Sequence, residues 1–461
     1  GTITTHTGNI TITDTPTSAQ LAAIDAATTG TITYSEGGGG GGGGDDHITG
    51  TSAQVIEVLQ SKSDYTGNIT ITDTPTLAQL KTINNATTGT ITLNDYSVAL
   101  TGSTADLAAA LAGTFAAAYT GNVTITDANA TSIAATDIST INTSTTGTIT
   151  VTNNINITGT AAEVAAALGN IDTFAGSPTA TLSNAHTLAD LKAINNAISG
   201  TITLDNYSVA LAGNSSDLAA ALAGTFADTY TGNITITDAD YTVAQLKTIN
   251  NATTGTITLN NTGVDLTGTA ADLVSAFAGT ITTHTGTITI NDANTTDITA
   301  TDITSINTAS TGTITVSNAI DINGSGSEVA AAFAAIDTNT GNATANVTGT
   351  DYTVAQLKTI NNATTGTITL NDYTVALAGS SSDLAAALAG SFSSSYTGTV
   401  TITNADYTVA QLKEINDATT GAITLSTTNT NLTGTAGDLV SAFAGTITTH
   451  TGNITITDTP T

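Results

Sequence analysis

The sequence predicts an α/β solenoid, a stack of parallel β-strands with one short helix in each coil. Many times along the chain, a glycine precedes a run of Thr alternating with Ile, Leu or Val. The interval between these glycines is shortest from Gly8 to Gly30 and from Gly67 to Gly89, and longest from Gly30 to Gly67. A helix-type segment lies between most of these runs. Periods of roughly 20–50 residues are typical of solenoids, whose repeats contact only their neighbours. We therefore expect about 16 coils of 22–37 residues.

The strand of each coil is expected to begin just after its glycine. In residues 232–237 (GNITIT) and 255–259 (GTITL), Thr alternates with Ile or Leu at the two-residue period of a half-buried strand. Ile and Leu then face the core, and Thr faces outward. Because a helical crossover separates consecutive strands, the strands are expected to pair in parallel.

Two kinds of helix are expected to follow the strands. In residues 240–249 (DYTVAQLKTI), Thr242 and Gln245 have the spacing of a capping box. Longer coils insert a second short strand, such as residues 264–266, before an Ala-rich helix. Those helices begin with Ser or Thr followed three residues later by an acid, which favours the helix N-terminus. The pairs are Ser103 and Asp106, Thr160 and Glu163, Thr269 and Asp272, Ser380 and Asp383, and Thr435 and Asp438.

Two longer periods are superimposed on the coils. Six coils form a super-repeat, which gives residues 121–285 and 286–451. Residues 1–17 recur without change as residues 445–461. We expect one continuous solenoid over residues 1–461, with a glycine-rich loop inserted at residues 35–50. Identical ends indicate that the stack continues, within a longer polypeptide or by end-to-end association of like subunits.

Composition and charge exclude several classes of protein. The chain has no Cys, so it has no disulfide framework and no thiolate metal site. No apolar run approaches the ~20 residues of a membrane-spanning helix, and we expect no membrane insertion. The formal net charge is −30, from 36 acidic residues against six Lys. Since phosphate binding depends on basic side chains, we expect no nucleic-acid partner.

Recurrence gives most lysines and histidines a structural interpretation. The lysines share one position on the helices and are expected to be solvated: Lys81, Lys192, Lys247, Lys358 and Lys413. Three histidines occupy the same Thr-Thr-His-Thr-Gly turn, and all five are expected in turns or on the surface: His6, His284 and His450 in that turn, with His47 and His186 elsewhere. Copies of one histidine, a super-repeat apart, do not form a metal cluster or a catalytic triad by themselves.

The glycine-rich segment holds the one candidate metal site. Gly41, Gly42, Gly44, Asp46 and Ile48 match the pattern G-G-x-G-x-D-x-U. This short segment resembles the calcium-binding nonapeptides of the repeats-in-toxin family. The resemblance implies calcium as a cofactor, with Asp45 and Asp46 as its ligands. A polar loop that binds no ion is the alternative, because no second copy supplies a further Asp.

As a whole, the repeats TVAQLKTINNATTGTITL and TGTAADLVSAFAGTITTHTG resemble those of giant extracellular and cell-surface proteins of bacteria, marine cyanobacteria in particular. The resemblance implies an extracellular or cell-surface location. We expect a non-enzymatic structural protein of a filament, surface layer or adhesin stalk, with other copies of itself as partner. The alternative is a calcium-dependent or adhesive ligand-binding module that uses acidic loops such as residues 237–240 and 291–294.

Overall fold

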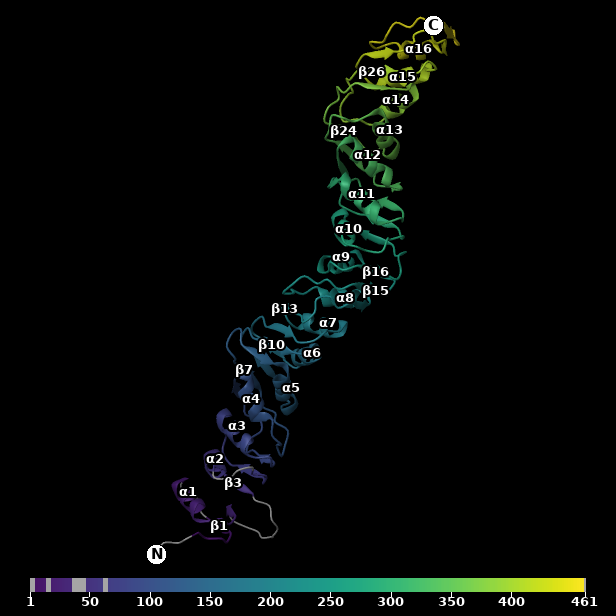
Figure 1. Ribbon diagram of the computed structural model, residues 1–461. Helices are drawn as coiled ribbons and strands as arrows, with labels where there is room; N and C mark the ends of the chain where they lie inside the picture. The colour runs from purple at the N-terminus through teal and green to yellow at the C-terminus, as the bar shows by residue number, and fades with distance from the viewer. Residues whose placement is uncertain (1–4, 14–17, 35–46, 61–64, 460–461) are drawn as a thin grey trace. The chain divides into compact units, whose positions relative to one another are not determined.

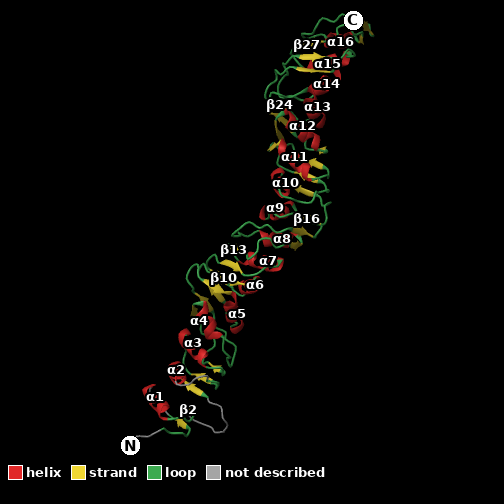
Figure 2. Ribbon diagram, in the orientation of Figure 1, coloured by secondary structure: helices red, strands yellow, loops and turns green. Residues whose placement is uncertain are grey.

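The computed structural model describes residues 5–13, 18–34, 47–60 and 65–459 of the chain (Figure 1). Helices and short strands alternate throughout these residues (Figure 2). The chain divides into two compact units: Gly1–Leu211 with Ala220–Thr231, and Ala212–Ala219 with Gly232–Thr461. Repeated parallel strands and helices make each unit an α/β solenoid. That residues 1–461 form one uninterrupted solenoid stays a prediction.

The first unit contains helices α1 to α7. They are α1 (Ser18–Ala27), α2 (Ser52–Gln60), α3 (Leu77–Ala86), α4 (Thr104–Leu111), α5 (Ala135–Ser144), α6 (Ala161–Gly169) and α7 (Leu188–Ala197). Its strands are β1 (Ile10–Ile12), β2 (Ile32–Tyr34), β3 (Ile48–Gly50), β4 (Ile69–Ile71), β5 (Ile91–Thr92), β6 (Leu100–Gly102), β7 (Val123–Ile125), β8 (Ser132–Ala134), β9 (Ile149–Val151), β10 (Asn156–Gly159), β11 (Thr173–Phe174), β12 (Thr179–Leu182) and β13 (Ile202–Thr203). The unit boundary crosses β14 (Leu211–Gly213) and α8 (Ser215–Leu222).

The second unit contains helices α9 to α16. They are α9 (Val243–Ala252), α10 (Ala270–Phe277), α11 (Ala300–Ala309), α12 (Gly326–Ala335), α13 (Val354–Ala363), α14 (Ser381–Leu388), α15 (Val409–Ala418) and α16 (Ala436–Ala442). Its strands are β15 (Ile234–Ile236), β16 (Ile257–Leu259), β17 (Leu266–Gly268), β18 (Ile288–Ile290), β19 (Asp297–Thr299), β20 (Ile314–Val316), β21 (Asp321–Gly324), β22 (Thr338–Asn339), β23 (Thr344–Val347), β24 (Ile368–Leu370), β25 (Leu377–Gly379), β26 (Val400–Ile402), β27 (Ile423–Leu425), β28 (Leu432–Gly434) and β29 (Ile454–Ile456).

Parallel pairing of consecutive coils is confirmed. Strand β15 pairs with β16 in parallel, with Ile234 opposite Ile257 and Thr235 opposite Thr258. The three isoleucines Ile234, Ile236 and Ile257 are fully buried, whereas Thr258 is exposed. The predicted orientation of the strand is therefore correct, since a slip of one residue would bury the Thr row instead.

The predicted helix starts are also confirmed. Thr242 caps α9: its hydroxyl accepts a hydrogen bond from the Gln245 amide, and the Gln245 side chain accepts one from the Thr242 amide. Val243, Leu246 and Ile249 are the buried apolar residues of this helix. In α10, the Thr269 hydroxyl accepts a hydrogen bond from the Asp272 amide.

The sheets are short and staggered, a feature that the glycine spacings do not reveal. Sheet β19-β21-β23-β24 ends at β24, and the next strand of the same coil, β25, begins the sheet β25-β26-β27. The same step separates β3-β4-β5 from β6-β7-β9-β11 in the first unit. The strand that pairs with the neighbouring coil therefore lies at a different point of the coil from one sheet to the next. The glycine before that strand consequently lies at a different sequence distance from the helix. From α2 to α16 the starts of successive helices are therefore spaced more evenly than the glycines are, with the shortest interval from Ser52 to Leu77 and the longest from Thr104 to Ala135.

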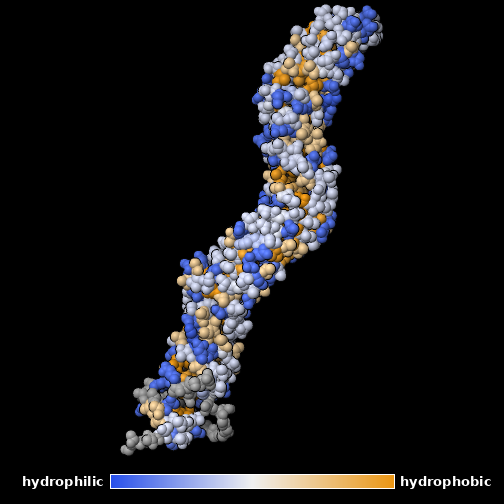
Figure 3. Space-filling model, viewed as in Figure 1, coloured by the Kyte–Doolittle hydropathy of each residue, from blue (hydrophilic) through white to orange (hydrophobic). Residues whose placement is uncertain are grey.

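The glycines that mark the coils are required by close stacking. A Cβ on Gly147 would lie 2.2 Å from the carbonyl oxygen of Gly121, one coil earlier, and a Cβ on Gly312 would lie 1.8 Å from that of Gly286. Only glycine allows the backbone to approach this closely. The apolar side chains meanwhile point inward, and Figure 3 shows apolar residues on the viewed face only as small separate patches.

Candidate functional site

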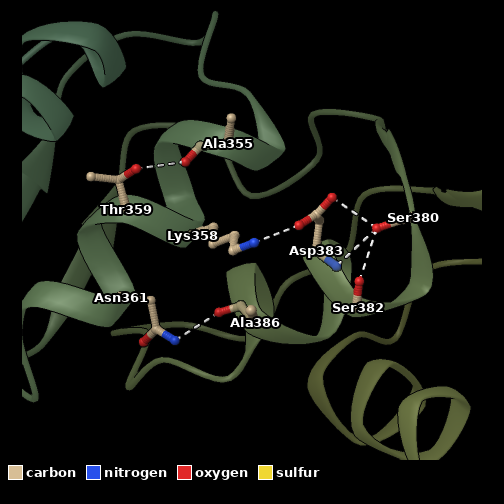
Figure 4. Close-up of polar contacts among 8 residues, drawn as sticks. All are labelled: Ala355, Lys358, Thr359, Asn361, Ser380, Ser382, Asp383 and Ala386. Atoms are coloured by element: carbon tan, nitrogen blue, oxygen red, sulfur yellow. Dashed lines mark hydrogen bonds and ion pairs between the residues drawn. The ribbon is translucent and has the colours of Figure 1, made fainter.

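Lysines and aspartates join neighbouring helices. Lys358 on α13 forms an ion pair with Asp383 in the first turn of α14, with 2.6 Å between Nζ and Oδ1 (Figure 4). The hydrogen bond from Lys358, followed by that from Ser380, lowers the pKa of the Asp383 carboxyl. The equivalent pairs are Lys81 and Asp106 (2.5 Å), Lys247 and Asp272 (2.5 Å), and Lys413 and Asp438 (2.9 Å). These four lysine side chains remain 38–42% accessible to solvent, and each in addition pairs with a carboxylate 25 residues further along the chain, which the sequence analysis did not predict.

Three residues after each of these lysines, an asparagine joins the same two helices through the C-terminal part of the second helix. Asn250 on α9 donates a hydrogen bond to the Ser275 carbonyl of α10 (2.8 Å) and accepts one from the Gly279 amide (3.0 Å). A Cβ on Gly279 would lie 2.2 Å from the Asn250 Oδ1, so glycine is needed just after the Ala-rich helix. Asn361 donates to the Ala386 carbonyl in the same way (Figure 4). In the sequence, the recurrence of Asn-Asn in one helix and of Ala-Gly after the next helix is the pattern that could have predicted this contact.

Acidic residues cap the helix of the coil before them. Asp292 Oδ2 accepts a hydrogen bond from the Ala270 amide at the start of α10 (2.7 Å), and Asp127 Oδ2 accepts one from the Thr104 amide of α4 (2.7 Å). The first amides of a helix lack partners within the helix, and a carboxylate there also favours the helix dipole. Asn404 does the same for Ser381 of α14. In the acidic loop 291–294, the Asp292 carboxylate therefore serves as a helix cap.

Two histidines lie in the core rather than at the surface. His284 is fully buried: its Nε2 lies 2.7 Å from the Val264 carbonyl oxygen, and its ring packs against Phe277. His186 is 3% exposed, with its Nε2 3.1 Å from the Tyr230 hydroxyl. Burial lowers the pKa of both imidazoles. His284 does lie in the predicted Thr-Thr-His-Thr-Gly turn, but this turn is packed between coils, so neither His284 nor His186 lies at the surface.

One polar cluster distinguishes the second super-repeat from the first. On sheet β19-β21-β23-β24, Asp297 lies opposite Asp321, and Asn323 donates to the Asp297 carboxylate (2.9 Å). Thr344 donates to Asp321. Asp297, Asp321 and Thr344, together with Asn346, line a shallow hollow of about 290 Å³. At the equivalent positions, the first super-repeat has Ser132 and Asn156 in place of the two acids. A position-by-position comparison of the two super-repeats could have revealed this cluster from the sequence.

The predicted calcium ligands Asp45 and Asp46 lie outside the described residues. Within the described ranges, no group of three or more His, Asp or Glu side chains is placed to hold a metal ion. In that part of the chain, no helix is both long enough and apolar enough to cross a membrane.

Comparison with known proteins adds no family to this description. No protein-family model matches the chain, and no curated protein matches its sequence.

Proposed function

We propose that this chain is a non-enzymatic structural protein of a filament, surface layer or adhesin stalk. One observation carries the proposal: the polar residues that recur in the repeats are engaged between coils. Lys247 and Asn250 each bridge α9 to α10, and Asp292 caps α10 from the coil that follows it. These contacts use the carboxylates, amides and ammonium groups that a catalytic site would need, and they hold successive coils in register.

Self-association completes the proposed role. The exposed strand edge of a solenoid accepts a further strand, and natural solenoids cover such edges with polar capping coils. The coils of this chain repeat, and the helices Val243–Ala252 and Val354–Ala363 have the same sequence, so a second copy of the chain offers coils that match those already stacked within it. We therefore propose like subunits as the partner. We place the protein outside the cell, where salt screens a net charge of −30, and propose that it binds neither nucleic acid nor membranes.

Electron microscopy and analytical ultracentrifugation of the full chain test this function. We expect filaments or a broad series of multimers of the 45.5 kDa chain. A monodisperse monomer across the micromolar range would contradict self-assembly.

The second candidate, an adhesive ligand-binding module, is favoured by the hollow around Asp297 and Asp321. Oxygen-rich side chains of this kind suit a polar ligand such as a glycan. Glycan-array binding by the full chain that is saturable, and that is lost in the double variant Asp297→Ser with Asp321→Asn, would support it. That variant restores the residues of the first super-repeat and should leave the fold intact. Absence of any such binding would rule this candidate out.

A further inference from the structure

We infer that His186 makes the coil of α7 an acid-sensitive point in the first unit, where the fold opens locally as the pH falls. This inference does not depend on the proposed assembly. It rests on the position that His186 takes in the repeat, on the hydrogen bonds around its ring, and on a buried ring nitrogen that has no partner in the described part of the chain.

His186 occupies a position that tyrosine holds in three other coils. It stands directly before the residue that caps α7, as Tyr241, Tyr352 and Tyr407 stand before the caps of α9, α13 and α15. Each of these tyrosines is buried and donates its hydroxyl proton to a backbone carbonyl 20 residues further along the chain. The imidazole of His186 is shorter than a phenol, and its hydrogen bond goes to a different group.

The hydrogen bonds fix which ring nitrogen of His186 carries the proton. The Tyr230 hydroxyl donates its one proton to the Val209 carbonyl oxygen (2.6 Å). Towards His186 the Tyr230 oxygen can therefore only accept, and the donor is His186 Nε2, 3.1 Å away. Since Nε2 carries the proton of the neutral ring, Nδ1 is unprotonated. Nδ1 is buried and has no hydrogen-bond partner among the described residues.

Protonation of this ring is costly in the folded chain. The second proton would go to Nδ1, where no acceptor meets it, and a positive charge would enter a side chain that is 3% exposed. A buried donor without an acceptor and a buried charge without a partner each destabilise the folded state. Burial accordingly lowers the pKa of the imidazole. In the locally opened coil, water hydrates the ring, so that the open form takes up the proton instead.

The charged groups around the ring do not remove this cost. Asp190 on α7 opposes the effect of burial, but its carboxylate is partly exposed and accepts hydrogen bonds from the amide and hydroxyl of Thr187. Tyr230 stays neutral because burial raises its pKa. Asp205 and Asp228, in the turns near the two groups that follow His186 in the hydrogen-bonded chain, are exposed. None of these groups is hydrogen-bonded to Nδ1.

His284, which is also buried, is better provided for a second proton. Its Nε2 donates to the Val264 carbonyl oxygen (2.7 Å), and its Nδ1 lies 3.4 Å from the Ser310 hydroxyl oxygen. The Ser310 hydroxyl already donates to the His284 carbonyl (3.1 Å), so its oxygen is free to accept from a protonated Nδ1. Protonation thus finds an acceptor at His284 and none at His186. We therefore expect the coil of α7 to respond to acid more strongly than the coil of His284.

Hydrogen exchange of the full chain, followed by mass spectrometry and corrected for the intrinsic effect of pH, tests the inference. One proton taken up on opening raises the open population by up to about tenfold for each pH unit below the ordinary pKa of 6.5. In the natural chain, the peptides that cover α7 should therefore lose protection by up to about tenfold between pH 6 and pH 5. The peptides that cover the turn of His284 should lose less.

Three variants of the full chain complete the experiment. His186→Tyr is the matched variant, because three other coils have tyrosine at this position, and it should abolish the pH dependence of exchange at α7. His186→Phe removes the titrating ring without restoring a hydroxyl, and it should abolish the pH dependence even if it weakens the coil at every pH. His284→Tyr should leave the pH dependence at α7 unchanged. An equal loss of protection at α7 in the natural chain and in His186→Tyr would overturn the inference, as would an earlier loss around His284.

Nitrogen NMR of the histidine-labelled chain tests the hydrogen-bond assignment separately. The signals of His186 are those that disappear in His186→Tyr. At pH 7.5 they should show a protonated Nε2 and an unprotonated Nδ1. A proton on Nδ1 would contradict the assignment and, with it, the acid-sensitive point.

Discussion

Tyrosine and histidine alternate at one position of the repeat because both can reach the same backbone carbonyl. The Tyr119 hydroxyl donates to the Val98 carbonyl oxygen (2.5 Å), and in the second super-repeat His284 Nε2 meets the Val264 carbonyl oxygen at 2.7 Å. Burial raises the pKa of Tyr119 to about 12, so the phenol stays neutral near pH 7. Burial lowers the pKa of His284, although the Val264 carbonyl and the Asp265 charge oppose this effect.

The substitution His284→Tyr should therefore reduce the sensitivity of the fold to acid. The unfolded chain binds a proton on this imidazole near its ordinary pKa of 6.5, and the folded chain does so only at lower pH. The stability that depends on the neutral ring is present above pH 6.5 and is lost as the pH falls towards the folded-state pKa. Each unit of pKa difference corresponds to about 1.4 kcal/mol.

Thermal unfolding at pH 7.5 and pH 5 measures this effect. The melting temperature of the natural chain should fall more between the two conditions than that of His284→Tyr. His47 is exposed, and His47→Tyr is the matched control, which should keep the full acid sensitivity. An equal fall in all three proteins would mean that carboxylates, not His284, cause the acid loss.

At the scale of the element, the Ala-rich helices α4, α10 and α14 each receive acceptors from two coils. In α10, the Thr269 hydroxyl accepts from the Asp272 amide (3.1 Å), and Asp292 of the following coil accepts from the Ala270 amide (2.7 Å). The first contact is local in sequence, and the second fixes one coil on the next. The N-terminus of the helix is thus completed only when the following coil is in place.

Replacing Asp292 by Ala should destabilise the second unit by about 1–3 kcal/mol, because it leaves a buried helix amide without its acceptor. Asp292→Asn should cost much less, since Asn404 makes the equivalent bond to Ser381 at 2.8 Å. Urea unfolding curves of both variants measure the difference. Equal losses in the two variants would show that the charge of Asp292, rather than its hydrogen bond, stabilises α10.

The contrast between local and cross-coil contacts explains how much could be predicted from the sequence. Thr242 with Gln245, and the strands after Gly232 and Gly255, were predictable because each signal lies within a few residues. The partner of Lys358 is 25 residues away, and it faces the lysine only because successive helices begin at nearly even spacing. The staggering of the sheets and the burial of His284 likewise depend on how coils stack.

At the scale of the whole molecule, electrostatics opposes the proposed assembly of like copies. The chain has 36 acidic residues and six Lys, and the four ion pairs described above leave most of the negative charge uncompensated. Association of like copies brings equal net charges of −30 together. If the chain assembles as proposed, the contacts between copies must therefore exceed this repulsion, and their margin depends on ionic strength.

Raising NaCl from 0.05 M to 1 M should increase both the size of the assemblies and the melting temperature. The Debye length falls to about 3 Å at 1 M, shorter than the ~4.8 Å between paired strands, so repulsion between charges on neighbouring coils is strongly screened. Screening also weakens the Lys–Asp pairs, but these four pairs are exposed and few against the net charge. Sedimentation velocity across the NaCl series measures the size. Millimolar CaCl₂ at matched ionic strength separates screening from specific binding at Asp45 and Asp46: a further increase with calcium but not magnesium would indicate that site. Assemblies that shrink as NaCl rises would mean that salt bridges between copies, rather than apolar strand stacking, hold the subunits together.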